Sequence, residues 1–174
     1  MVDLRDTICA LSSAPGRSGI AVVRLSGPNS FGIVARVFLP YRAQPEMPPR
    51  CAVLGRVCDP HTGSELDEAL VTRFYAPRSY TVEDVAEVSI HGSTVVVSHL
   101  LEFLCREGAR LAEPGEFTLR AFLNGRIDLA QAEAVRDVVE ANTLYQLQVA
   151  GRQRSGELSR QLGPVRRQLT DVIV

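Results

Sequence analysis

The chain has 174 residues, 45% of them hydrophobic and 22% charged, and a net charge of −1 at pH 7, which is ordinary for a soluble globular protein. No apolar run approaches the roughly 20 residues of a transmembrane helix, and the N-terminus lacks the basic and apolar regions of a secretory signal. All 19 basic residues are arginine, so the chain has no lysine for a phosphate-binding P-loop or a Schiff base.

The N-terminal segment begins with two short runs rich in β-branched residues, which the turn "PGRSG" separates within residues 7–27. This pattern predicts two neighbouring strands, with Arg24 near the end of the second. Residues 27–39 follow with apolar positions that fit one face of a helix. Asn29 or Ser30 is the expected N-cap of that helix.

The middle of the chain predicts more strands. Residues 51–59 and 69–77 read as two strands, and residues 60–69 between them read as a hairpin-type loop. Residues 84–92 alternate apolar and polar side chains, which is typical of a half-buried strand. This strand carries Glu87 among apolar neighbours.

A change of pattern marks the end of this mixed region. Residues 93–108 predict a helix that stops at a glycine, and residues 109–114 predict a short edge strand or an extended link. After Gly115 the pattern is purely helical. The sequence therefore predicts an α+β fold, with a mixed β-sheet domain and packed helices in residues 1–117 and an all-helical segment in residues 118–174.

The helical segment opens with the run "PGEFTLRAFLNGRIDLAQAEAV", which predicts two short helices that break at residues 124–125. Arg126 stands at the joint, and Asp128 with Gln131 forms a capping arrangement for the second helix. We expect this helix to bury one stripe, made of Leu129, Ala132, Val135, Val138 and Val139.

A last helix is expected to start after Thr143 and to run toward Val174, with a kink or break at residues 163–164. Its apolar positions require a further partner for burial: Leu158, Leu162, Val165, Leu169 and Val172. From Gly151 onward five arginines face two acidic residues, a local charge of 5 − 2 = +3. A solvated helix face is the ordinary explanation for this excess.

Three charged residues are candidates for a binding site. Glu87 needs partners if its strand is buried, and its two oxygens suit a paired N–H donor edge such as that of a pterin or guanine ring. Alternatively, the pleat turns Glu87 toward solvent. Arg24 ends a strand and Arg126 lies beside a helix N-terminus, so both suit carboxylates or carbonyls, although each alone is compatible with an ordinary surface residue.

The cysteines give no sign of a metal site. Cys9, Cys51, Cys58 and Cys105 form no C-x-x-C pair, and their spacing does not match common zinc motifs. We expect reduced, mostly buried thiols in a cytoplasmic protein.

Three segments stand in the order and spacing of motifs of one protein family: "DTICALSSAPGRSGIAVVRLSGP", "YTVEDVAEVSIHGS" and "PGEFTLRAFLNGRIDLAQAEAVRDVVEA". By these segments the chain resembles the tRNA-modification GTPase family MnmE, also called TrmE, over nearly its whole length. Two positions depart from the family pattern, because Val82 and Ser93 stand where glycines are usual.

The resemblance implies a first domain similar to tetrahydrofolate-binding aminomethyltransferase domains. This domain is expected to form a homodimer and to bind 5-formyltetrahydrofolate through the family positions that match Arg24, Glu87 and Arg126. A helical domain follows in the family, with an inserted Ras-like GTPase domain that uses GTP, Mg²⁺ and K⁺.

The same resemblance implies a cytoplasmic enzyme that works with the FAD-dependent protein MnmG (GidA). Together they place an aminomethyl-type group on the wobble uridine of certain tRNAs. The GTPase domain is absent from these 174 residues, so this chain alone is expected to be inactive. Two alternatives stay open: a dimerisation module whose folate site has decayed, and direct tRNA contact by the arginine-rich last helix.

Overall fold

The structure, a computed structural model, describes residues 5–42 and 48–157 and the single positions 160, 162, 164 and 168. The chain divides into two compact units, Met1–Phe117 and Thr118–Val174. The first combines a mixed sheet with helices, and the described part of the second is helical, so the predicted α+β class is confirmed. In the described part of the chain, no helix combines the length and apolar character needed to cross a membrane.

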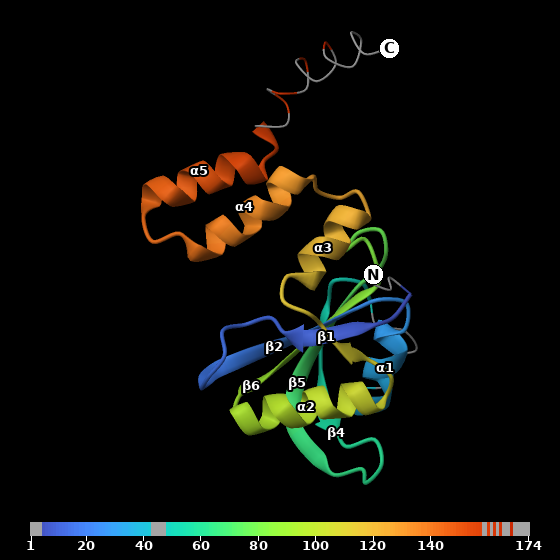
Figure 1. Cartoon of the computed structure of the whole chain (residues 1–174). Coiled ribbons are helices and arrows are strands. Elements are labelled where there is room, and N and C mark those ends of the chain that lie inside the picture. The colour runs from blue at the N-terminus through green and yellow to red at the C-terminus, as the bar shows by residue number, and fades with distance from the viewer. Residues whose placement is uncertain are drawn as a thin grey trace. The chain divides into compact units, whose positions relative to one another are not determined.

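The first unit is built on one sheet of seven described strands in the order β3-β4-β5-β6-β2-β1-β7 (Figure 1). The strands are β1 Ile8–Leu11, β2 Ser18–Ser26, β3 Phe38–Pro40, β4 Ala52–Cys58, β5 Glu65–Phe74, β6 Val85–Gly92 and β7 Arg110–Leu111. All neighbours are antiparallel except β1 and β7, which are parallel. The two N-terminal strands expected from the sequence are therefore confirmed as neighbours.

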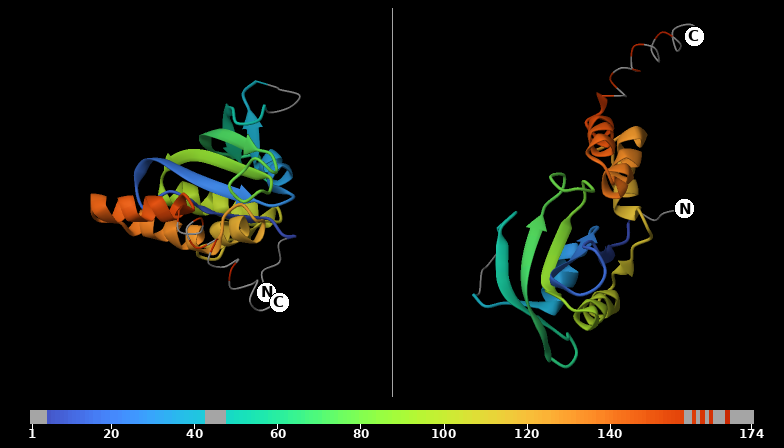
Figure 2. Two further views of the ribbon diagram at one scale, coloured as in Figure 1. Left: turned by 90° about the horizontal axis from the view of Figure 1, so that it is seen from above. Right: turned by 90° about the vertical axis from the view of Figure 1, so that its left-hand side faces the viewer.

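Two helices cover one face of this sheet. Helix α1 (Ser30–Val37) and helix α2 (Thr94–Arg106) lie on the same side of the strands in the edge-on view of Figure 2. Alternate residues of the central strands, among them Val23, Val71 and Val88, are fully buried and form one hydrophobic core with these helices. The opposite side chains of the same strands point away from α1 and α2.

The uncovered face of the sheet carries exposed apolar side chains. Ile20, Leu54 and Leu70 are 66%, 46% and 41% exposed and line one shallow hollow. Leu54 and Leu70 are also direct partners across β4 and β5. These three residues, called the open-face patch below, break the rule that strand pleating buries apolar residues and exposes polar ones.

Two predicted boundaries in the first unit are wrong. The hairpin loop expected over residues 60–69 is shorter, because β5 already begins at Glu65 and pairs with β4. The helix expected to reach residue 39 ends at Val37, because Phe38 begins β3 and pairs with Val57. In both cases pairing with β4 overrides the local pattern.

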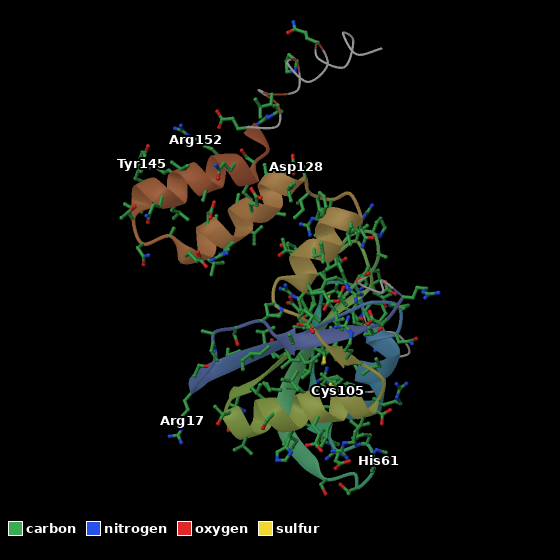
Figure 3. The ribbon with its side chains drawn as sticks, viewed as in Figure 1. Arg17, His61, Cys105, Asp128, Tyr145 and Arg152 are labelled. Atoms are coloured by element: carbon green, nitrogen blue, oxygen red, sulfur yellow. The ribbon has the colours of Figure 1, made fainter. Side chains whose placement is uncertain are left out.

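The second unit contains a helical hairpin. Helix α3 (Glu116–Leu123) crosses the boundary between the units, and α4 (Leu129–Glu140) and α5 (Leu144–Arg154) follow. A capping box begins α4, since the side chains and backbone N–H groups of Asp128 and Gln131 bond reciprocally at 2.9 Å. Figure 3 labels Asp128 here and Tyr145 and Arg152 on α5. The predicted capping arrangement is confirmed.

Two expectations for this unit are not met. The stripe predicted for α4 is not buried as a whole, because Leu129 and Val139 are 60% and 80% exposed while Ala134 is the buried residue of this helix. The last helix does not run unbroken, because α5 ends at Arg154 and Gly156 has a φ of 76°. Such a left-handed glycine is a common helix stop.

The remaining apolar positions predicted for the last helix are Leu158, Leu162, Val165, Leu169 and Val172. Leu162 is 54% exposed, and the other four lie outside the described residues. The predicted break at residues 163–164 also includes a position that the structure does not describe.

All four cysteines are free thiols. Cys9 and Cys58 are buried, Cys105 is partly buried, and Cys51 is exposed. The sulfur atoms of Cys9 on β1 and Cys105 on α2 are 3.9 Å apart (Figure 3 labels Cys105). Burial, with the nearby Cys105 thiol, raises the pKa of Cys9 to about 12, so this thiol stays protonated at neutral pH.

Candidate functional site

The sheet brings two of the three predicted site residues together. Arg24 on β2 and Glu87 on β6 are direct partners in the antiparallel register. Both side chains alternate with the buried core residues of their strands, so they project from the face opposite α1 and α2. Their direct contact depends on the register between strands 63 residues apart, which is not a local property of the sequence.

These two side chains form a charge-assisted pair. The Arg24 guanidinium donates from Nε at 2.9 Å and from Nη2 at 2.7 Å to the same Glu87 oxygen, Oε1. The second oxygen, Oε2, accepts no hydrogen bond from any described residue. Since the side chains are 27% and 26% exposed, the pair is partly shielded but accessible. Glu87 is therefore neither fully buried nor simply solvated.

Two aromatic rings flank the Arg24 guanidinium. Its central carbon lies 5.7 Å from the Tyr80 ring centroid and 5.8 Å from that of Phe117. Both distances fall within the range of a cation–π interaction. Neither ring is among the site residues predicted from the sequence, although Tyr80 begins the "YTVED" segment and Phe117 lies in "PGEF". Their positions inside two motifs were the available signal.

The loop that carries Tyr80 is held by hydrogen bonds to the strands and to α1. Asp84 connects three points, because its carbonyl accepts from Gly27 N–H at 3.0 Å and from the Ser30 hydroxyl at 3.0 Å, and its carboxylate accepts from Ala76 N–H at 2.9 Å. Tyr75, at the start of the loop, packs against Phe31 with ring centroids 4.8 Å apart. The loop therefore has a fixed course over residues 75–84.

A buried polar cluster lies beside this loop. The hydroxyl groups of Ser26 and Thr81, both 0% exposed, are 2.6 Å apart, and the Ser26 hydroxyl also donates to Glu83 Oε2 at 2.6 Å. Between the two loop members stands Val82, whose φ is 68°. This left-handed conformation is costly for a β-branched residue, whereas glycine adopts it freely.

Arg126, the third predicted site residue, lies in the second unit. It follows Gly125, whose φ of 73° ends α3 at the expected break. The Arg126 backbone N–H donates to the Ala121 carbonyl at 3.0 Å, which fixes the corner, and the residue is exposed. The structure thus pairs Arg24 with Glu87 and places Arg126 on a separate compact unit.

A histidine on the uncovered sheet face forms a second polar pair. His91 Nδ1 lies 2.7 Å from Asp67 Oδ1, and the His91 backbone N–H donates to Asp67 Oδ2 at 2.8 Å. The hydrogen bond to Asp67 and its negative charge raise the pKa of His91 above the usual value of 6.5. The His91 side chain is 70% exposed and borders the open-face patch.

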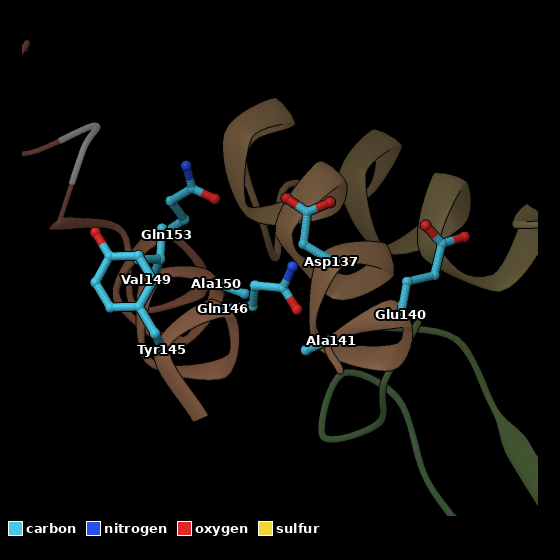
Figure 4. A pocket seen from close by; sticks show the side chains of 8 residues that line it. All are labelled: Asp137, Glu140, Ala141, Tyr145, Gln146, Val149, Ala150 and Gln153. Carbon is cyan, nitrogen blue, oxygen red and sulfur yellow. The ribbon is translucent and has the colours of Figure 1, made fainter. Parts of the chain in front are cut away.

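A groove of about 400 Å³ lies between α4 and α5 (Figure 4). Asp137 and Glu140 project from α4 on one side, and Tyr145 and Val149 on α5 lie on the other. Glu140 is already bonded to Arg136 at 2.8 Å. No group of three or more His, Cys, Asp or Glu side chains suited to a metal ion occurs among the described residues.

The Arg24–Glu87 pair can accept a hydrogen bond from a ligand. A carboxylate held on one oxygen by an arginine offers its other oxygen to an N–H donor, and the two charges largely cancel. The site therefore suits a planar ligand edge with N–H groups better than a free anion.

Comparisons with known proteins place the chain in a family. The family profile described as "GTP-binding protein TrmE N-terminus" matches residues 7–126. Relatives named "tRNA modification GTPase MnmE" from Koribacter versatilis, Carboxydothermus hydrogenoformans and Moorella thermoacetica are 45%, 46% and 47% identical over 172 residues. These alignments cover 99%, 98% and 98% of this chain but 38%, 37% and 37% of the relatives. The chain, which spans less than two fifths of these relatives' length, belongs to the TrmE (MnmE) family and carries that family's N-terminal domain.

Proposed function

We propose that this chain forms the folate-binding, dimerising N-terminal part of a tRNA-modification GTPase. Its ligand is 5-formyltetrahydrofolate, which supplies the one-carbon unit for an aminomethyl-type modification of the wobble uridine of tRNA. Folate binding and dimerisation belong to residues 1–117, whose fold would then resemble tetrahydrofolate-binding aminomethyltransferase domains. Residues 118–174 form the beginning of the helical domain.

The observation that carries this proposal is the Arg24–Glu87 pair with its free carboxylate oxygen. A reduced pterin ring has an amino group beside a ring N–H, which matches an ionised carboxylate as acceptor. Both lone pairs of Glu87 Oε1 are engaged by Arg24, so Oε2, which has two lone pairs of its own, is the acceptor for these hydrogens. Arg126 provides a separate positive charge for a ligand carboxylate or carbonyl.

The activities in the relatives' names belong to a longer protein than this chain. These 174 residues contain no lysine for a P-loop. We infer that GTP, Mg²⁺ and K⁺ are bound by parts of the family's proteins that lie outside this chain. In the full enzyme this chain would act on tRNA together with the FAD-dependent protein MnmG. Its place of action would be the cytoplasm, where tRNA is modified.

Homodimerisation fits the uncovered face of the sheet. The open-face patch of Ile20, Leu54 and Leu70 is apolar, and Arg56 and Glu68, direct partners on β4 and β5, carry opposite charges on the same strands. A two-fold interface joins the same surface of both copies, so a face with both charge signs is self-complementary. A second copy of this chain is therefore the proposed occupant of the open-face patch.

Isothermal titration with 5-formyltetrahydrofolate tests the folate site. Glu87→Gln replaces one acceptor oxygen by a donor, so a contact with a ligand N–H becomes repulsive. Hydrogen bonds to a charged group contribute roughly 1.5–3 kcal/mol, which predicts a 10- to 100-fold loss of affinity. Glu65→Gln, which changes an exposed carboxylate on β5, is the matched control and should bind as the parent does. Equal affinity of Glu87→Gln and parent would refute the assignment of Glu87.

Arg126→Ala tests the third site residue with a different signature. The loss of affinity should be largest at low salt and should shrink as the ionic strength rises, because Arg126 is exposed and its charge is screened. The Glu87→Gln loss should depend little on salt. A salt-independent effect of Arg126→Ala would remove this residue from the site.

The second candidate function is a dimerisation module whose folate site has decayed. Val82 favours this alternative, because the left-handed position that suits the family's glycine is occupied by a strained residue next to the site. Absence of folate binding by the parent chain, together with intact self-association, would select this alternative.

A further inference from the structure

We propose that Tyr80 and Phe117 are positioning residues of the Arg24–Glu87 site. Both rings contact the Arg24 guanidinium and hold it in place, and the guanidinium in turn fixes the Glu87 carboxylate toward the ligand. This inference rests on the proposed folate function of the same site. It assigns a role to two side chains that act through Arg24.

The geometry explains why Arg24 needs external support. Both of its hydrogen bonds end on a single oxygen of Glu87, which constrains the guanidinium less than a fork with one bond to each carboxylate oxygen. A long side chain that is 27% exposed is not immobilised by burial. The Tyr80 and Phe117 rings, with centroids 5.7 and 5.8 Å from the guanidinium carbon, supply the missing constraint.

Hydrogen bonds hold the segment that carries each ring. Tyr80 lies in the loop of residues 75–84 that Asp84 fastens to Gly27 N–H and to the Ser30 hydroxyl. Phe117 follows Glu116, whose carboxylate is only 2% exposed.

The Glu116 carboxylate fastens the start of α3. It accepts from Arg110 Nη2 at 2.7 Å, from Arg110 Nη1 at 3.0 Å and from Glu113 N–H at 2.8 Å. Arg110 also donates to Asp6 at 2.8 Å, which ties this corner to the N-terminal segment. Two separate sets of hydrogen bonds therefore hold the segments that carry Tyr80 and Phe117, and both rings contact the same guanidinium.

Removal of a ring should loosen Arg24 without removing any atom of the charge pair. The direct consequence is faster solvent exchange of the Arg24 Nε–H proton, which NMR measures without any ligand. We expect Tyr80→Ala to accelerate this exchange about 5-fold, in line with the free energy of one cation–π contact. Tyr80→Phe keeps the ring face and should keep the parent rate. Unchanged exchange in Tyr80→Ala would overturn the proposal even if folate binds.

Folate titration of the 174-residue chain gives the second measurement. Tyr80→Ala and Phe117→Ala should weaken 5-formyltetrahydrofolate binding about 5- to 10-fold, and Tyr80→Phe should restore it. Tyr41→Ala removes an exposed ring beside the distant edge strand β3 and is the matched control. If Phe117→Ala fails to fold, the Tyr80 pair of variants still decides.

A double-mutant cycle separates positioning from direct ligand contact. If Tyr80 acts through Arg24 and Glu87, Tyr80→Ala in a Glu87→Gln background should cost less than about 2-fold in affinity. Additive losses would show that the ring meets the ligand by itself and would overturn the proposal. If the parent binds no folate but Tyr80→Ala still accelerates Arg24 exchange, the positioning role holds and the proposed folate function fails.

Discussion

At the scale of single residues, Val82 has a strained backbone conformation that a substitution by glycine should relieve. Its φ of 68° lies in the left-handed region, which costs an ordinary residue about 1–2 kcal/mol. We expect Val82→Gly to raise the free energy of unfolding by about 1 kcal/mol, since part of the relief is offset by the larger unfolded-state entropy of glycine. Urea unfolding measures this change.

A control substitution should move stability in the opposite direction. Val95 is 60% exposed on α2, so Val95→Gly puts glycine inside a helix and should lower the free energy of unfolding by roughly 0.5 kcal/mol. A loss of stability in Val82→Gly as well would show that the packing of the Val82 side chain outweighs its backbone strain.

His91 makes the stability of the sheet depend on pH. Asp67 raises the His91 pKa in the folded state, so the pair stabilises the fold fully below the unfolded value of about 6.5. This contribution disappears as the pH rises through the folded-state pKa, which lies above 6.5. We expect Asp67→Asn to lower the His91 midpoint in an NMR titration and to destabilise the protein more at pH 5.5 than at pH 8.5. Glu65→Gln, on the same strand, should leave the His91 midpoint in place.

The residue types of the site were visible in the sequence, but their pairing was not. The apolar alternation around Glu87 and the motifs around Arg24 singled out both residues before any coordinates. Their mutual contact depends on the register of β2 with β6, which is set by the whole sheet. Tyr80 and Phe117 were overlooked for the same reason, since each reaches Arg24 only through the folded chain.

At the scale of elements, the helix boundaries that were predicted correctly are those that a few neighbouring residues determine. Gly125 ended α3 and the Asp128–Gln131 pair began α4 as expected, because turns and caps depend on a few neighbouring residues. The early start of β5 and the existence of β3 were missed, because they depend on β4 as a pairing partner.

The capping box of α4 gives a prediction at this scale. Asp128→Ala removes the side-chain acceptor of the Gln131 N–H, which is worth about 1 kcal/mol. Amide hydrogen exchange in the first turn of α4 should accelerate about 5-fold. Asp137→Ala, an exposed change in the same helix, should leave these amides unchanged. Equal acceleration in both variants would mean that charge, and not the cap, controls this end.

At the scale of the whole chain, exposed apolar side chains occur on two surfaces. One is the open-face patch of the first unit, and the other comprises exposed side chains of α4 and α5 such as Val139, Leu144 and Tyr145. Contiguous exposed apolar surface marks interaction sites. The sequence predicted a need for partners but placed it on the last helix, much of which lies outside the described residues.

Self-association of the first unit is the prediction that follows. Sedimentation velocity at tens of micromolar should show a dimer of two 19.0 kDa chains, because this concentration exceeds the dissociation constant of an ordinary dimer. Ile20→Asp places a charge at the most exposed residue of the open-face patch, 66% exposed, and should give a monomer. Val95→Asp, at a 60% exposed site on α2 over the opposite face, should remain dimeric. A monomeric parent would contradict dimerisation, and dissociation by Val95→Asp alone would move the interface to the helical face.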